Sequence, residues 1–306
     1  IYRSTDNANT WTLLPNTKDY ILAINSHNQT IYISTANEGV KQSNNNGDTW
    51  TTTTQGLPET DVLCFTSSSD TLYAGTWSNG IYYTTNNGQT WQQGTLNDKD
   101  ITQYIITPFH HFAGTWNHGI YKSSDHGITW QPTATTTPNA KITSLQFING
   151  NLYAALQTGT IVRSTNNGEN WNEITIANSS HIIAIEQFEQ NIIAATTNGI
   201  HYSSDNGTTW INLGLNDVNI HDIHIANNTL YAGTDKHGIW KINLQTLTGT
   251  QQHQEQSHEF ALTFSPNPSN GNLQCHIHHH PQTNPVILTI YTMQTEKIYE
   301  QHIDQN

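Results

Sequence analysis

The chain has 306 residues, enough for one large hydrophobic core or two smaller ones. Its 10 lysines and arginines are outnumbered by 23 aspartates and glutamates, and the resulting net charge of −13 would repel a phosphate backbone, which excludes nucleic acid as an expected partner. Only 11% of the residues are charged, while Thr, Asn, Ile, Tyr and Trp recur between Gly and Asn turn signals. The composition therefore predicts an all-β chain.

Neither a membrane span nor a disulfide is expected. The apolar segment PVILTIY (285–291) has the length of a strand, far short of what crosses a bilayer. The two cysteines, Cys64 and Cys275, fall in parts of the chain that we expect to be separate domains.

One eight-residue phrase recurs six times within the first 210 residues. Each copy ends in Trp, and successive tryptophans are 39, 41, 39, 41 and 39 residues apart, the period of a four-stranded propeller blade. We call these segments the octapeptides: STDNANTW (4–11), SNNNGDTW (43–50), TTNNGQTW (84–91), SSDHGITW (123–130), STNNGENW (164–171) and SSDNGTTW (203–210).

Four short strands, A to D, are predicted in each unit. In 142–175 they read ITSLQFI, LYAAL, TIVRS and NWNEIT, with turn residues between them. One such sheet cannot bury both of its faces, so stacking the units in a ring supplies the core. The units begin near Ile21, Val62, Ile101, Ile142, Ile182 and Ile220, and a C–D fragment (1–14) precedes the first.

The prediction is a β-propeller of six or seven blades over 1–249. Seven is preferred, with an incomplete first blade whose A and B strands would lie upstream of Ile1. The alternative closes a six-bladed ring by pairing the N-terminal D strand with the strands of 220–243.

The octapeptides lie between strands C and D, and their chemistry is typical of turns. The third side chain can accept a backbone N–H, Gly at the fifth position tolerates positive φ, and the Trp buries a large area. Half the copies carry Asn at the third position, which keeps the acceptor but not the charge, so neither a metal ligand nor a catalytic acid is expected there. These structural residues are Asp6, Asn45, Asn86, Asp125, Asn166 and Asp205, with Trp11, Trp50, Trp91, Trp130, Trp171 and Trp210.

This pattern resembles the Asp-box, or bacterial neuraminidase (BNR) repeat, of propellers in sialidases, xyloglucanase-like glycosidases, sortilin-type receptors and photosystem assembly factors. Ala8 departs from it, because the family has Gly there. Sialidases hold the substrate carboxylate with three arginines. This chain has only Arg3 and Arg163, each directly before the Ser of an octapeptide, so sialidase activity is not expected.

A ligand is expected at the end of the ring opposite the octapeptides, where antiparallel strands place the B–C and D–A loops. The Asp-box resemblance implies the same face. Two B–C loops carry Trp at equivalent positions, and flat aromatic faces beside Asn and His suit a sugar ring or a peptide; the alternative is that each Trp packs on a neighbouring loop. The predicted ligand-binding residues are Trp77, Asn79, Trp116, His118, Asp235 and His237.

A second ring of residues is predicted just before strand A, at the mouth of the central channel. Its three carboxylates could bind a cation or serve glycoside hydrolysis, and the alternative is that they are solvated loop acids. The members of this ring are Asp19, Asp61, Asp100, Lys141, His181 and Asn219.

The tail is predicted to be a polar linker (250–259) and a small, truncated β-sandwich (260–306). SPNPSNGNL (265–273) and LTIYTMQTEKIYEQ (288–301) resemble part of the C-terminal sorting domain of the type IX (Por) secretion system of Bacteroidetes-like bacteria. The resemblance implies export to the cell surface or beyond, with the secretion machinery as a partner. CHIHHH (275–280) would place His276, His278 and His280 on one face of a strand, which suits adventitious metal better than a physiological site.

The function expected from the sequence is non-catalytic binding of an extracellular glycan or protein ligand, without a cofactor. The alternatives are a glycoside hydrolase of the xyloglucanase-like type, using two of Asp19, Asp61 and Asp100, and a purely structural or adhesive surface protein.

Overall fold

The computed structural model describes residues 1–248, except 16, 18, 19, 37, 59, 60, 135–139, 178, 180, 217 and 236, together with the backbone of two strands at 286–291 and 297–303. Strands dominate these ranges, and the one described helix is α1 (Gln245–Thr248). No helix in the described part of the chain is long and apolar enough to cross a membrane.

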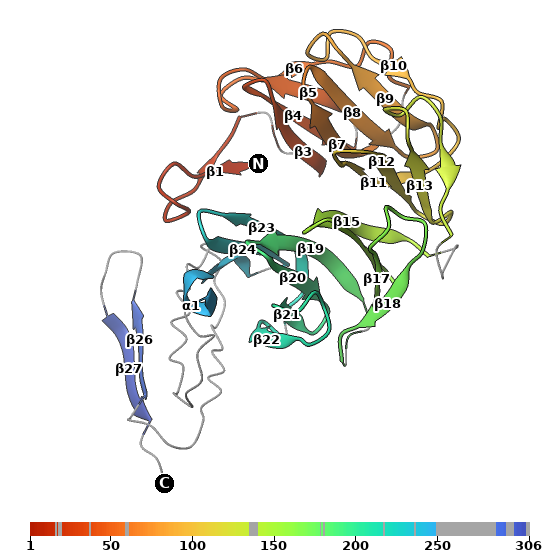
Figure 1. The fold of residues 1–306 in the computed structure, drawn as a ribbon. Coiled ribbons are helices and arrows are strands. Elements are labelled where there is room, and N and C mark those ends of the chain that lie inside the picture. The colour runs from red at the N-terminus through yellow and green to blue at the C-terminus, as the bar shows by residue number, and fades with distance from the viewer. Residues whose placement is uncertain are drawn as a thin grey trace.

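The chain winds into six blades, each a sheet in which consecutive strands pair antiparallel (Figure 1). The innermost A strands are β3 (Ile21–His27), β7 (Val62–Ser68), β11 (Ile101–Ile106), β15 (Ile142–Ile148), β19 (Ile182–Phe188) and β23 (Ile220–Ala226). The B strands are β4 (Thr30–Thr35), β8 (Thr71–Thr76), β12 (His111–Thr115), β16 (Asn151–Leu156), β20 (Asn191–Thr196) and β24 (Thr229–Thr234).

The outer strands are shorter. The C strands are β5 (Gly39–Ser43), β9 (Gly80–Thr84), β13 (Ile120–Ser123), β17 (Thr160–Ser164), β21 (Gly199–Ser203) and β25 (Gly238–Asn243). The D strands are β6 (Thr51–Thr52), β10 (Gln92–Gln93), β14 (Gln131–Pro132), β18 (Asn172–Thr175) and β22 (Ile211–Gly214). Blades 1 to 5 thus have four strands each, and blade 6 has three, β23 to β25.

The six blades correct the preference for seven. The alternative ring closure also differs from the structure, because the N-terminal D strand β2 (Thr12–Leu13) pairs with β1 (Tyr2–Arg3) in a sheet of its own. This hairpin bridges the first and last blades. Arg3 donates to the Asn46 carbonyl at 2.7 Å and to Asp48 at 2.8 Å in blade 1, while Lys241 of blade 6 donates to the Asn7 carbonyl at 2.7 Å.

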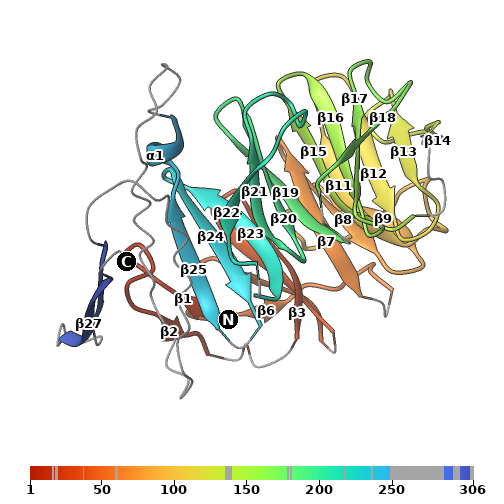
Figure 2. The same cartoon turned by 90° about the horizontal axis from the view of Figure 1, so that it is seen from below.

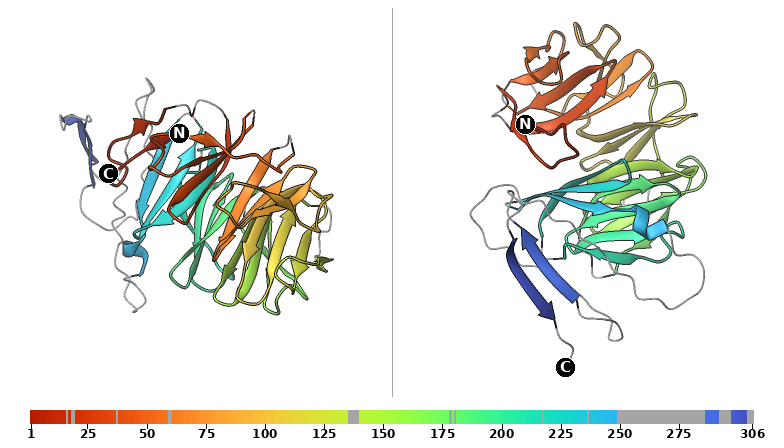
Figure 3. Two further views of the ribbon diagram at one scale, coloured as in Figure 1. Left: turned by 90° about the horizontal axis from the view of Figure 1, so that it is seen from above. Right: turned by 90° about the vertical axis from the view of Figure 1, so that its left-hand side faces the viewer.

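The hydrophobic core lies between blades. Each of five clusters joins residues of two neighbouring sheets; Tyr32 and Val40 of blade 1, for example, pack with Leu72 and Tyr82 of blade 2. Figure 2 and the left view of Figure 3 show the sheets standing side by side like the vanes of a fan. Within the described residues no such cluster links blade 6 to blade 1, so the polar contacts of the β1–β2 hairpin take that place.

The octapeptides form one hydrogen-bonded turn, repeated with little variation. In the fourth copy, the Ser123 hydroxyl donates to Asp125 at 2.7 Å and accepts the Gly127 N–H at 2.8 Å. Asp125 in turn accepts the Thr129 N–H at 2.8 Å. The fourth and fifth residues both have positive φ, which Asn and Gly tolerate best, and Ala8 adopts this conformation at 60°.

In the five copies that have Thr at the seventh position, Asp and Asn are interchangeable because their second polar atom can meet the Thr hydroxyl. Asp125 accepts a hydrogen bond from the Thr129 hydroxyl at 2.6 Å, whereas the Asn45 amide donates to the Thr49 hydroxyl at 2.9 Å. A hydroxyl can do either. The prediction that the carboxylate is dispensable has this structural reason.

The tail is described only as an antiparallel pair, β26 (Val286–Tyr291) and β27 (Lys297–Ile303). The expected linker at 250–259 and the residues His276, His278 and His280 lie outside the described residues.

Replacing the three octapeptide aspartates by asparagine (Asp6→Asn, Asp125→Asn, Asp205→Asn) should reduce the acid sensitivity of the fold. Hydrogen bonds from the Thr129 hydroxyl and N–H, then from Ser123, lower the pKa of Asp125 to about 2. A lowered folded-state pKa gives stability that is complete above the ordinary pKa of Asp and is lost as pH falls through the folded value. Thermal unfolding followed from pH 7 to pH 2 should decline less steeply below pH 4 in the variant; equally steep decline would contradict the hydrogen-bond account.

Ser164→Ala should lower the free energy of unfolding by about 1–3 kcal/mol, because it leaves the buried Gly168 N–H, now 2.9 Å from the hydroxyl, without an acceptor. Ser164→Thr is the matched control, since Thr84 makes the same bond to the Gly88 N–H at 3.0 Å. Urea unfolding measures both. Equal stability of Ser164→Ala and wild type would show that the hydroxyl contributes nothing.

Candidate functional site

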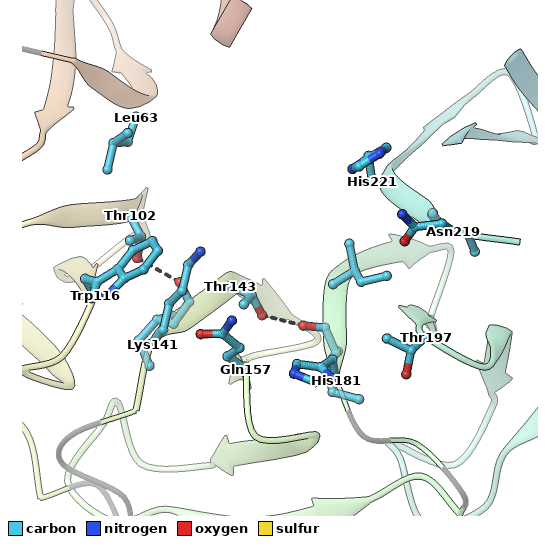
Figure 4. A pocket seen from close by; sticks show the side chains of 14 residues that line it. Leu63, Thr102, Trp116, Lys141, Thr143, Gln157, His181, Thr197, Asn219 and His221 are labelled. Atoms are coloured by element: carbon cyan, nitrogen blue, oxygen red, sulfur yellow. Dashed lines mark hydrogen bonds between the residues drawn. The ribbon is translucent and has the colours of Figure 1, made fainter. Parts of the chain in front are cut away.

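An open cavity of about 570 Å³ lies at the channel mouth, at the end of the strands opposite the octapeptides. Its walls come from the first residues of the A strands and from the B–C loops of blades 3 to 5, with Leu63 contributed by blade 2 (Figure 4). The lining residues are Leu63, Thr102, Trp116, Lys141, Ile142, Thr143, Gln157, His181, Ile182, Ile183, Thr197, Asn219, Ile220 and His221.

Every A strand begins with a β-bulge, and in blades 2 to 6 the bulged residue lines this cavity. The register with strand B skips one residue in each blade, as between Ile142 and Ser144 or between Ile220 and Asp222. A bulge leaves one extra residue unpaired and turns it away from the regular alternation. The skipped residues are Leu22, Leu63, Thr102, Thr143, Ile183 and His221, and all but Leu22 line the cavity.

The bulged threonines also tie neighbouring blades together. The Thr102 hydroxyl donates to the Ile142 carbonyl, and the Thr143 hydroxyl donates to the Ile182 carbonyl, each at 2.7 Å (Figure 4). The cavity floor is therefore held at fixed spacing by hydrogen bonds from one blade to the next.

A second repeated contact fixes the rim. The carbonyl of the residue before strand A accepts the N–H of the residue after strand B: Asp100 from Trp116 at 3.0 Å, Lys141 from Gln157 at 3.0 Å. Blade 1 makes the same bond from Ala36 to Tyr20, also at 3.0 Å. Tyr20, rather than Asp19, is thus the equivalent member of the predicted ring, and Asp19 itself lies outside the described residues.

Trp77, Trp116 and Lys141 stack in sequence along the rim. The two indole rings meet edge to face, with centroids 5.0 Å apart, and the Lys141 ammonium lies 3.8 Å from the centre of the Trp116 ring. The tryptophans remain 39% and 37% exposed. The two tryptophans therefore pack against each other across neighbouring loops and still keep a part of their surface exposed, so the two alternatives predicted from the sequence occur together.

Lys141 differs in its electrostatic surroundings from three of the other described lysines. Lys41 pairs with Glu38, Lys99 with Asp98 and Lys122 with Glu169, whereas Lys141 has no ion pair among the described residues. Burial lowers the pKa of Lys141, with no carboxylate opposing the shift.

The two described carboxylates of the ring, Asp61 and Asp100, belong to blades 2 and 3 and do not line the cavity. Asp100 accepts hydrogen bonds from the Ser78 N–H at 2.7 Å and from its hydroxyl at 3.2 Å. It therefore fastens the B–C loop of the preceding blade.

Of the six predicted ligand-binding residues, Trp116 alone lines the cavity. The Asn79 amide donates to the Trp77 carbonyl at 3.3 Å, and His237 contacts the Asp235 carbonyl at 2.9 Å, so these side chains order their own loops. His118 is exposed on its loop. The ring before strand A was the better guide, since Lys141, His181 and Asn219 all line the cavity.

Sequence reasoning missed Gln157 and Thr197, which follow strand B at the positions equivalent to Trp116. Aligning the residue after each B strand would have found them. Sequence reasoning also missed the bulged residues. The signal that could have found them is a one-residue break in the alternation of apolar and polar residues at the start of each A strand.

Comparison with known proteins supports the architecture. Residues 120–227 match the family described as the DUF6242 beta propeller domain. No curated protein matches the sequence.

Among solved structures, YCF48 bound to D1 peptide superposes with a TM-score of 0.61 at 16% identity, over 75% of this chain and 79% of that one. The extracellular domain of a hybrid two component system from B. thetaiotaomicron gives 0.63 at 14% identity, over 82% of this chain. An ancestral GH74 enzyme gives 0.62 at 17% identity, over 74% of this chain. This chain spans only 35% and 36% of the latter two proteins. The strand order, the inter-blade cores and the family match lead to one conclusion: the chain is an all-β, six-bladed propeller, of which residues 120–227 match the DUF6242 beta propeller domain.

Proposed function

We propose that the chain is a non-catalytic binding propeller, secreted or displayed at the cell surface, that holds a glycan or protein ligand in the channel-mouth cavity. The observation that carries the proposal is the lining: a cation, a tryptophan, two histidines and two amides share one open cavity with aliphatic walls. Binding sites commonly combine such apolar walls with a few convergent polar groups.

Two structural neighbours support this reading. The YCF48 structure shows a propeller of this fold with a bound peptide, and the B. thetaiotaomicron neighbour is an extracellular domain. The Asp-box character of the octapeptides and the resemblance of the tail to a type IX sorting domain fit an exported protein, with the secretion machinery as its partner during export.

The second candidate function is a glycoside hydrolase, because an ancestral GH74 enzyme is among the structural neighbours. Hydrolysis needs two carboxyl groups about 5–10 Å apart, one on each side of the scissile bond. The cavity offers none from its described lining, and the Asp100 carboxylate is engaged by Ser78. The geometry therefore favours binding over hydrolysis, and over a purely structural or adhesive role, which needs no cavity.

The variant Trp77→Ala/Trp116→Ala should lose retention on glycan and peptide arrays while keeping a cooperative thermal transition. Truncating a central interface tryptophan commonly costs about 2 kcal/mol or more. Trp11→Ala is the matched control, because Trp11 is equally exposed, at 38%, but belongs to an octapeptide at the opposite end of the strands. Undiminished binding by the double variant, or equal loss with Trp11→Ala, would place the ligand elsewhere.

A reducing-sugar assay on plant and host polysaccharides should show no turnover by the wild-type chain. Asp61→Asn and Asp100→Asn are assayed in parallel. Turnover by wild type that either substitution abolishes would establish the hydrolase in place of the binding module.

A further inference from the structure

We infer that the cavity recognises an acidic peptide, in which a carboxylate binds Lys141 on the wall that also carries His181, across from His221, while flanking apolar side chains rest on the isoleucine walls. This deepens the proposed function, on which it rests, by naming the ligand class and the residues that select it.

The first step is the state of Lys141. It is half-buried, and its ammonium group lies against the Trp116 ring without a hydrogen bond or ion pair among the described residues. Lys241, which likewise has no ion pair, still donates two hydrogen bonds, to the Asn7 carbonyl and to the Asn9 side chain. A partly desolvated ammonium without a counter-ion attracts an anion more strongly than a paired surface lysine does.

The second step is the separation of charge around the mouth. The side chains of Asp61 and Asp100 come from blades 2 and 3, whereas Lys141, His181 and His221 come from blades 4, 5 and 6. Figure 4 shows Lys141, Gln157 and His181 along one wall and Asn219 with His221 across the cavity. No carboxylate is present among the described lining residues, although the chain as a whole carries a net charge of −13. The cavity is thus the part of an acidic protein in which an anion meets no repulsion from the walls.

The third step distinguishes a peptide from a sugar. A sugar ring stacks on a free aromatic face, but one face of Trp116 is covered by the Lys141 ammonium at 3.8 Å, and Trp77 packs against the same ring. The walls are formed by Leu63, Ile142, Ile182, Ile183 and Ile220, which offer nothing to sugar hydroxyls. These aliphatic surfaces suit apolar side chains, and the amides of Gln157 and Asn219 can bond both groups of a peptide unit.

The fourth step concerns the kind of anion. Phosphate recognition favours clusters of arginine with bidentate geometry. The lining has one lysine and no arginine among its described residues, which matches the single charge of a carboxylate.

The test uses the full chain and an array of peptides capped at both ends, in which each central Asp or Glu is paired with its Asn or Gln isostere between Ile, Leu or Val neighbours. Wild type should bind the acidic members about tenfold or more tightly than the amide members, the effect of one hydrogen bond between charged groups. Lys141→Gln should lose that preference, Lys141→Arg should keep part of it, and the control Lys122→Gln should change nothing. Thermal unfolding verifies that each variant is folded.

Three outcomes would overturn the inference: an unchanged acidic preference in Lys141→Gln, equal binding of acidic and amide peptides by wild type, or binding confined to phosphopeptides. A glycan array run with the same variants separates this failure from that of the proposed function. Glycan binding that needs Trp116 but not Lys141 would refute the acidic-peptide inference and leave the proposed binding function standing. No binding to either array would refute both.

Discussion

The structure depends on the fact that a four-stranded sheet of this sequence cannot bury two faces without neighbours. Among the described residues, every hydrophobic cluster joins two blades, and none belongs to one sheet alone. A blade removed from its neighbours would expose residues such as Tyr32, Leu72 and Phe112, which are now buried. Stacking is therefore the source of stability, as is general for repeat proteins, and the turns and rims hold the stacked sheets in register.

The two ends of the strands divide this task. At one end, the polar groups of the octapeptides form hydrogen bonds within their own turn or with a neighbouring unit. Asp48 of the second octapeptide, for example, accepts a hydrogen bond from Arg3. At the other end the rim carbonyls and N–H groups pair with each other, which leaves side chains such as Lys141 and Gln157 directed to the channel. The proposed recognition site therefore lies at the end of the strands where polar side chains remain available.

The sequence was sufficient for the repeat but not for the site. Strand starts at Ile142 and Ile220 and the turn chemistry of the octapeptides could be predicted, because both depend on residues close together in the chain. The number of blades could not, since it depends on whether the β1–β2 hairpin joins the sheet of β23 to β25, and these segments lie at opposite ends of the repeat. The cavity lining could not be predicted either, because a β-bulge has no characteristic residue type. Leu63, Thr143 and His221 occupy equivalent backbone positions but have chemically different side chains. The sequence predicted Lys141 at the channel mouth, but only the structure shows that no described carboxylate pairs with it.

The bulges have a consequence for how such a protein can change its partner. A bulged residue is supernumerary to the pleat, so exchanging it leaves the inward and outward alternation of the remaining strand untouched. Bulged residues that belong to none of the described core clusters, such as Leu63 and His221, can therefore be exchanged without repacking a core between blades. At these positions the side chain that faces the cavity can vary while the residues that stabilise the fold stay the same.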